Sequence, residues 1–256
     1  MRCMVDDNQK VNIILTSPPY CTDKDDAKMY TDKKFYWYDV HYDVFEGFSS
    51  PEEYREWSVN LFNAYDSILM PNGVILYNIS YTKKEPDLMY RVLYDIITKT
   101  DFRIVDCIVW KKNSALPQNQ NKNRSTRVCE FVFVFVRNCE METFNTCKRT
   151  SDIYPARYVN LFQNYIEAPN NDILDRSVQK LNGATFSTSL VTQLLNIYAK
   201  PEYVVYDSFM GTGTTAVACK RFGCNFIGSE ISAAQVEFAN KRLFGTHIHK
   251  TNKQLF

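Results

Sequence analysis

The chain has 256 residues, of which 45% are hydrophobic and 23% charged, a balance typical of a globular protein. Its net charge of +1 excludes a polybasic, histone-like protein, so any nucleic-acid contact must come from a local patch. Eight cysteines without a Cys-x-x-Cys pair, and only three histidines, argue against a metal site and for a reducing compartment. With no signal-like or membrane-spanning run, we expect an intracellular, cytoplasmic protein.

The first predicted element is a strand over Val11–Leu15, which ends at the corner Ser17-Pro18-Pro19-Tyr20. Two adjacent prolines have fixed φ and no N–H, so strand pairing stops there. The corner is either a simple turn or a rigid holder of a hydroxyl and a ring against a flat substrate. Residues 21–49 follow with several large aromatics and no clear period, which predicts a long loop. The aromatics favour a loop that acts as a lid, and the alternative is a disordered surface segment.

The strongest helix pattern starts at Ser50, runs through Leu69 and stops at Pro71-Asn72-Gly73. The alternation of helices and strands predicts a mostly parallel α/β sheet with helices on both faces. In such folds ligands bind beyond the carboxyl ends of the strands, so the corners at 17–20 and 208–214 share one crevice if their strands are neighbours. The further expected elements are strands at 74–79, 102–110, 130–136, 203–207 and 225–228, and helices at 86–98, 187–200, 214–222 and 232–244.

A glycine-rich turn follows the strand that ends at Asp207. Gly211 and Gly213 remove Cβ atoms where a ligand approaches the backbone, and Glu230, past the end of the next strand, can accept both hydroxyls of a ribose. The pattern therefore predicts a site for a nucleoside-containing cofactor. A tight turn without a ligand stays open, as does NAD, because Ala216 is allowed at the third glycine position of the dinucleotide fingerprint. A P-loop is excluded, since no Gly-Lys-Ser/Thr ends the turn.

Six segments in this order resemble the motifs of the amino-directed DNA methyltransferases of the β group, in which the catalytic half precedes the cofactor half. The resemblance covers most of the chain and implies a circularly permuted, Rossmann-like, doubly wound methyltransferase fold with a small inserted recognition region. The segments are TSPPY (16–20), LMPNGVILYNIS (69–80), the Trp-Lys-Lys region and strand at 108–136, ATFSTSLVTQLL (184–195), DSFMGTGTT (207–215) and GSEISAAQVEFANKRL (228–243).

The resemblance implies transfer of the methyl group of S-adenosylmethionine to the exocyclic amine of a flipped DNA base, as in restriction–modification. The catalytic residues would be Ser17, Pro18, Pro19 and Tyr20: the Pro18 carbonyl and Ser17 hydroxyl accept the amine N–H groups, and Tyr20 stacks on the base. The cofactor would be held by Asp207, Phe209, Gly211, Gly213, Thr214, Glu230, Thr185 and Phe186. A serine at position 17 favours N4 of cytosine over the alternative, N6 of adenine.

Double-stranded DNA is the partner that the resemblance implies. A basic run without acids is a natural phosphate contact, although it also fits a solvated loop; it holds Lys111, Lys112, Lys122, Arg124 and Arg127. We divide the chain into a catalytic half (1–137), an insertion that we expect to serve target recognition (138–182) and a cofactor half (183–256). An insertion of this size implies a short recognition sequence, a homodimer or a partner subunit that helps recognition.

The chain departs from the family pattern at several positions. Only Met1–Lys10 precede the first strand, where the family has a strand and an acid that places adenine. Either Asp6 or Asp7 would serve instead, or Phe209 and the backbone alone would hold the adenine. Ser208 stands where proline is usual. A non-catalytic DNA-binding subunit with the same fold and an NAD-linked oxidoreductase are the rival interpretations; the latter leaves Ser-Pro-Pro-Tyr unexplained.

Overall fold

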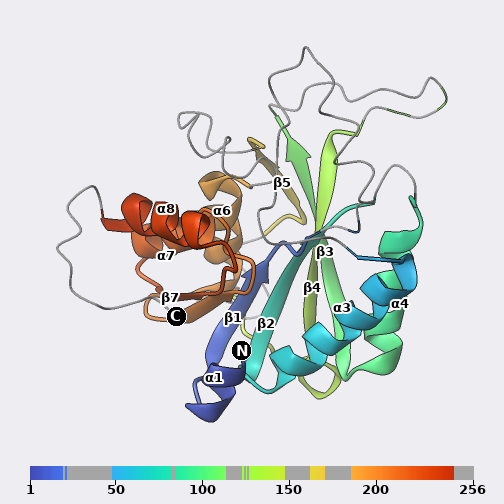
Figure 1. Ribbon diagram of the computed structural model, residues 1–256, viewed down its shortest axis with the longest axis horizontal. Helices are drawn as coiled ribbons and strands as arrows, with labels where there is room; N and C mark the ends of the chain where they lie inside the picture. The colour runs from blue at the N-terminus through green and yellow to red at the C-terminus, as the bar shows by residue number, and fades with distance from the viewer. Residues whose placement is uncertain are drawn as a thin grey trace, which may run out of the picture.

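The computed structural model describes residues 1–19, 21, 48–81, 85–113, 123, 125, 127–147, 162–170 and 186–244. Within these residues a single seven-stranded sheet carries helices on both faces (Figure 1). The strands, in spatial order, are β5 (Tyr165–Ala168), β3 (Phe102–Lys112), β4 (Cys129–Arg137), β2 (Leu69–Ile79), β1 (Val11–Thr16), β6 (Val204–Asp207) and β7 (Asn225–Gly228). The helices are α1 (Arg2–Asp6), α3 (Pro51–Asp66), α4 (Leu88–Lys99), α6 (Thr188–Tyr198), α7 (Thr214–Phe222) and α8 (Ala233–Phe244), with a 3₁₀ turn, η1, at Asn138–Glu140.

The sheet is mostly parallel, which confirms the predicted fold class. β4 runs antiparallel to both of its neighbours, β2 and β3, and every other adjacent pair is parallel. β4 lies inside the sheet, as its unbroken apolar run predicted. In the part of the chain that the structure describes, no helix has the length and apolar character needed to cross a membrane.

Alternate strand residues pack on opposite faces of the sheet. Ile14 and Tyr77 belong to the hydrophobic cluster under α3 and α4, whereas Ile13 and Leu76 belong to the cluster under α6 and α7. The two helical layers lie on either side of the sheet in Figure 1. Because successive side chains of a strand point to opposite faces, consecutive residues covered on both faces are apolar, which explains the run Ile13–Leu15 within β1.

Helix α3 begins as its sequence predicts. The Ser50 side chain accepts a hydrogen bond from the Glu53 N–H at 3.1 Å, and the Glu53 carboxylate accepts one from the Ser49 N–H at 2.6 Å. Pro51 occupies the first helical turn, where its missing N–H is not needed. This capping arrangement fixes the start of the helix that later carries Tyr65 to the site.

The predicted end of this helix was wrong. It ends at Asp66, and Leu69 already begins β2. Val11 pairs with Leu69 and Ile13 with Val74, so the Pro-Asn-Gly segment bulges out of the strand instead of stopping a helix. Ile68 and Leu69 would be buried whether the segment were the end of a helix or the start of a strand, so their spacing did not distinguish a helix from a strand.

Two elements were not predicted. α1 precedes β1, and β5 pairs in parallel with β3 from within the predicted insertion, so part of that segment extends the main sheet. The division into two halves and an insertion stays a prediction. The predicted lid, apart from Cys21, Phe48 and Ser49, and most of residues 138–182 lie outside the described residues.

Candidate active site

The two unusual corners of the sequence lie at adjacent strand ends. β1 and β6 are parallel neighbours, with Ile13 opposite Val205 and Ile14 opposite Tyr206. The Thr16 hydroxyl, at the end of β1, donates a hydrogen bond to Oδ1 of Asp207, at the end of β6, over 2.9 Å. The proline corner and the glycine turn therefore leave the sheet side by side, as expected if the strands were neighbours.

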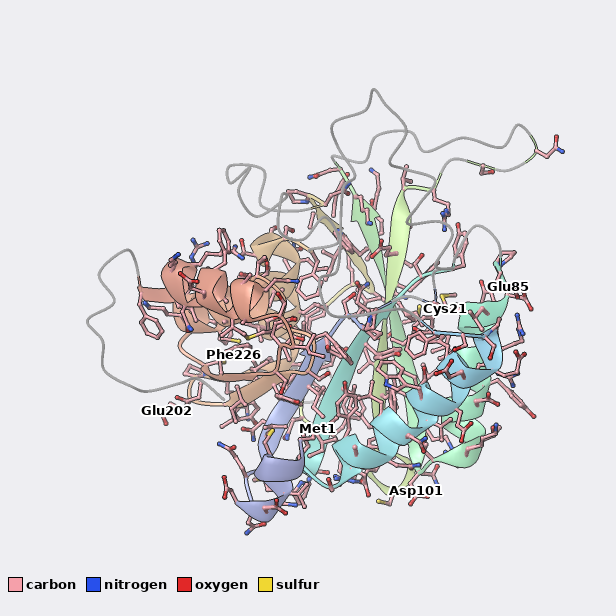
Figure 2. The ribbon with its side chains drawn as sticks, in the orientation of Figure 1. Met1, Cys21, Glu85, Asp101, Glu202 and Phe226 are labelled. Atoms are coloured by element: carbon pink, nitrogen blue, oxygen red, sulfur yellow. The ribbon has the colours of Figure 1, made fainter. Side chains whose placement is uncertain are left out.

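Within the proline corner, Pro18 is buried, and Ser17 and Pro19 are half-buried. The pairing of β1 with β2 ends at Thr16, directly before the corner. Cys21, just past it, lies at the opposite end of the sheet from Asp101, which precedes β3 (Figure 2). Tyr20 lies outside the described residues, so its stacking role stays a prediction.

Asp207 organises the turn after β6. Its side chain is 2% exposed, and burial raises its pKa from the ordinary 3.8 to about 6, although hydrogen bonds to the carboxylate oppose that rise. Besides the bond from Thr16, Oδ1 accepts the Phe209 N–H at 3.1 Å and Oδ2 accepts the Thr215 hydroxyl at 2.6 Å. Both oxygens are thus engaged within the protein, and a direct cofactor contact of Asp207 stays a prediction.

The glycines of the turn have conformations that favour glycine. Gly211 and Gly213 have φ of 51° and 78°. A Cβ on Gly213 would lie 2.8 Å from Cβ of Ala239 in α8, so this glycine also permits close helix packing. Thr214 begins α7, and its hydroxyl lies 3.3 Å from Nη1 of Arg242, which donates to the Thr212 carbonyl at 2.8 Å.

Backbone hydrogen bonds hold the Glu230 carboxylate against this turn. Its Oε2 accepts the Gly211 N–H and its Oε1 accepts the Ser232 N–H, each at 2.9 Å. A carboxylate oxygen has more than one acceptor direction, so both can still accept further donors. The sequence placed Glu230 near the glycines, and the hydrogen bond to Gly211 confirms that proximity.

The predicted aromatic cofactor residues belong to different faces of the sheet. The Phe209 ring packs 5.6 Å from the Trp57 ring on the α3 side. Phe186 is buried in the cluster under α6 and α7. Thr185 lies outside the described residues.

The predicted acids for adenine placement do not reach this edge of the sheet. Asp6 and Asp7 are exposed and lie at the N-terminal end of β1, whereas the corners lie at its carboxyl end (Figure 1). The suggestion that one of them replaces the missing family acid is therefore wrong. Among the described residues, no group of three or more His, Cys, Asp and Glu side chains could hold a metal ion.

Two of the described lysines of the basic run are paired with acids. Lys111 pairs with Glu167 of β5 at 2.7 Å, and this hydrogen bond raises the pKa of Lys111, while Lys112 pairs with Glu130 of β4. Both acids come from neighbouring strands and lie outside residues 111–127, so the sequence of the run does not reveal the pairing. Lys122 and Arg124 lie outside the described residues.

Arg127 differs from these lysines. It donates to the Tyr81 carbonyl, and its guanidinium lies 5.0 Å from the centroid of the Tyr81 ring. None of the ion pairs within the described ranges involves Arg127. Tyr81 follows β2, the other neighbour of β1, so this stacked pair lies beyond the same sheet edge as the proline corner.

Comparison with known proteins places this arrangement in a family. Type II methyltransferase M.HinfI of Haemophilus influenzae is 27% identical in an alignment of 243 residues that covers 92% of this chain. The aligned region spans only 64% of that relative's length.

Two solved structures share the fold. The cytosine-N4-specific PvuII DNA methyltransferase superposes with a TM-score of 0.67 at 18% identity, over 94% of this chain and 82% of that one. The M1.HpyAVI–SAM complex superposes with a TM-score of 0.63 at 22% identity, over 95% and 93%. The "DNA methylase" family model matches residues 11–241, and the chain belongs to that family, the N6/N4 DNA methylases.

Proposed function

We propose that this protein transfers a methyl group from S-adenosylmethionine to the exocyclic amine of a base in double-stranded DNA. The observation that carries the proposal is the Thr16–Asp207 hydrogen bond, which joins the end of the catalytic strand to the glycine turn. A methyl transfer needs its donor and acceptor within a few ångströms, and corners at adjacent strand ends would support that geometry. The M1.HpyAVI structure is a complex with SAM and the PvuII protein is a DNA methyltransferase, which supports the proposal.

The cofactor half fits S-adenosylmethionine. When bound, that molecule supplies an electrophilic sulfonium methyl group. The Glu230 carboxylate, fixed by two backbone N–H groups, would accept the ribose hydroxyls. Gly211 and Gly213 would let the methionine portion approach the backbone, and Phe209 would pack against the adenine. Thr214, Phe186, Thr185 and the structural Asp207 would complete the site.

The catalytic half would activate the amine without a covalent intermediate. The amine is a poor nucleophile because its lone pair is delocalised into the ring. The Pro18 carbonyl and the Ser17 hydroxyl would accept its N–H groups and favour a tetrahedral nitrogen. Flipping the base out of the duplex costs a few kcal/mol. Stacking on Tyr20 would return about 1–3 kcal/mol of that cost.

N4 of cytosine is the first choice of target, with N6 of adenine as the alternative. Ser17 at the first corner position favours cytosine by resemblance, and the PvuII enzyme, which shares the fold, is named as cytosine-N4-specific. Both amines offer the same two donors, so the corner chemistry serves either base. Arg127 would contact the DNA, with Tyr81 beneath it, while residues 138–182 would contribute to target recognition.

The test is methylation of long, unmodified duplex DNA that contains every short sequence, followed by digestion to nucleosides and mass analysis. N4-methylcytosine is expected, and N6-methyladenine would move the target to the alternative. Ser17→Ala should abolish transfer while S-adenosylmethionine still binds, and Ser49→Ala, which alters an exposed serine, should behave like the parent protein. Binding of the cofactor and of DNA without any methylated nucleoside would favour the non-catalytic subunit, and preference for NAD would refute the proposal.

A further inference from the structure

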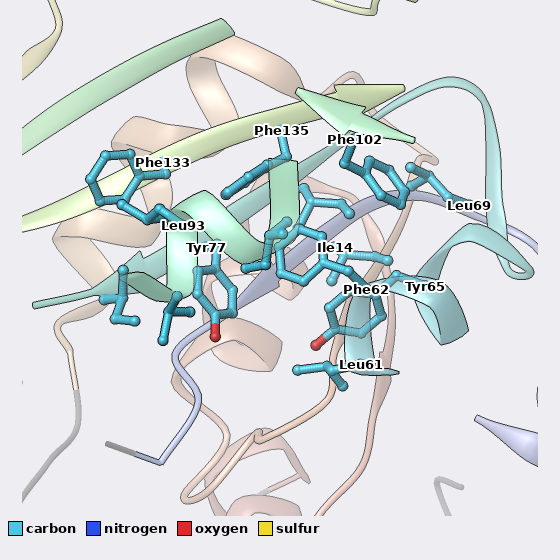
Figure 3. Packing of buried hydrophobic residues seen from close by; sticks show 14 of the residues in the cluster. Ile14, Leu61, Phe62, Tyr65, Leu69, Tyr77, Leu93, Phe102, Phe133 and Phe135 are labelled. Carbon is cyan, nitrogen blue, oxygen red and sulfur yellow. The ribbon is translucent and has the colours of Figure 1, made fainter. Parts of the chain in front are cut away.

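A chain of buried hydroxyls connects helix α3 to the two corners. The Tyr65 hydroxyl is hydrogen-bonded to Oγ of Ser208, the residue after β6. Ser208 Oγ lies 3.3 Å from Oγ1 of Thr16, which donates to Asp207 at 2.9 Å. Tyr65 and Thr16 have no exposed surface, and Ser208 is 8% exposed. Figure 3 shows Tyr65 beside Phe62 in the cluster that anchors it.

The hydrogen bonds in this chain have a defined direction. An ionised carboxylate only accepts, so the single proton of Thr16 points to Asp207. Ser208 must then donate to Thr16, which leaves its oxygen to accept from Tyr65. Each hydroxyl donates toward Asp207, and Tyr65 is the last donor. Bonds in such a buried chain strengthen one another.

The chain of hydroxyls spans the boundary between the catalytic corner and the cofactor turn. Thr16 directly precedes Ser17 of the proline corner, and Ser208 directly precedes the turn that holds Gly211. A proline at position 208 would restrict φ through its ring, whereas serine has no such restriction. The hydroxyl chain therefore supplies a constraint that the backbone at Ser208 lacks.

We propose that Tyr65 and Ser208 are positioning residues, which set the distance between the amine acceptors of the proline corner and the cofactor turn. The inference rests on the proposed methyl transfer. Neither residue needs to touch a substrate. Their loss would displace the turn slightly relative to the corner and leave both binding surfaces in place, so the transfer step would suffer more than binding.

The experiment compares Tyr65→Phe, Ser208→Ala, the double variant and Tyr77→Phe. Tyr77 packs against the same Phe62 ring, at 5.2 Å, and its hydroxyl takes no part in the hydrogen bonds that join Tyr65, Ser208 and Thr16. Single-turnover transfer of labelled methyl to duplex DNA is measured together with Kd for S-adenosylmethionine and for DNA. Thermal unfolding verifies that each variant is folded.

Each single variant should slow single-turnover transfer about tenfold while both Kd values change less than about threefold, because a misplacement below 1 Å affects the transfer step first. The double variant should be no slower than the slower single variant, since both remove the same constraint. Tyr77→Phe should transfer at the parental rate.

Three results would overturn the inference: an unchanged rate in Tyr65→Phe, additive losses in the double variant, or an equal loss in Tyr77→Phe. If Tyr65→Phe does not fold, the Ser208→Ala rate decides, since that change removes only one oxygen atom. If the unsubstituted protein fails to methylate DNA, the proposed function itself is refuted. If the unsubstituted protein is active and Tyr65→Phe is equally fast, only the positioning role is refuted.

Discussion

Asp207 should make the stability of this protein depend on pH in an unusual direction. Burial raises its pKa from 3.8 to about 6 in the folded protein. Between these two values the folded state keeps a proton that the unfolded state releases, so the free energy of unfolding falls as pH rises. The stabilisation is fully present below about pH 4 and is lost above about pH 6, and the shift corresponds to about 3 kcal/mol.

Asp207→Asn should remove this dependence. The amide oxygen can still accept from Thr16 and Phe209, and the amide nitrogen can donate to the Thr215 hydroxyl, which is free to rotate. The variant resembles the protonated aspartate at every pH. We therefore expect the stability difference, variant minus parent, to rise by about 2–3 kcal/mol between pH 4 and pH 7.

Urea denaturation at several pH values measures this difference, and subtraction removes the contributions of all other groups. Glu237→Gln is the control, because the hydrogen bond from Lys241 lowers the pKa of Glu237. The stabilisation by Glu237 is present at neutral pH and lost as pH falls, so its slope has the opposite sign. A stability difference for Asp207→Asn that does not change with pH would show that the carboxylate is not destabilised by burial.

Three further outcomes are expected. Arg127→Gln should weaken DNA binding and lower the slope of log K against log salt by about one, whereas Lys111→Gln, which removes an already paired charge, should change that slope less. Gly213→Ala should lower the free energy of unfolding more than Gly223→Ala, measured in urea, because both have positive φ but only a Cβ on Gly213 meets another atom within 4 Å. Glu230→Gln should raise Kd for S-adenosylmethionine in calorimetry about tenfold, and it should also lower the melting temperature of the free protein, because one amide oxygen cannot replace both carboxylate oxygens that accept backbone N–H groups.

The elements that the sequence predicted well are those with local signals. β1 and β4 each contain an apolar run, Ile13–Leu15 and Phe131–Val136, and the glycine turn has two residues whose conformation only glycine adopts easily. α3 carries its own cap in Ser50. Each of these signals lies within one short window of the chain, so no knowledge of the tertiary structure is needed to recognise it.

The features that the sequence did not predict depend on distant partners. β5 has four residues and gains its strand conformation by pairing with β3. The pairing of Lys111 with Glu167 joins residues 56 positions apart, so the run around the lysine looks purely basic. Tyr65 reads as one more apolar residue of an amphipathic helix, because its hydrogen-bond partner, Ser208, lies 143 positions away. Neither the period nor the composition of a segment reports such contacts.

The burial of Asp207 and the hydroxyl chain together explain why a carboxylate is suited to this position. An asparagine would avoid the cost of a buried charge, yet its amide presents one acceptor and one donor edge. Its neutral oxygen also accepts more weakly from Thr16 than a carboxylate does, so the Thr16 hydroxyl could turn to donate to Ser208 instead, which would reverse the hydroxyl chain up to Tyr65.

The carboxylate removes that freedom, because it accepts at both oxygens and fixes the direction of every hydroxyl in the chain. Asp207→Asn should therefore be more stable than the parent at pH 7.5 and slower in single-turnover methyl transfer, by about tenfold if the corner and turn shift by a fraction of an ångström. An asparagine variant that is both more stable and equally fast would show that the direction of the hydroxyl chain does not matter for the transfer.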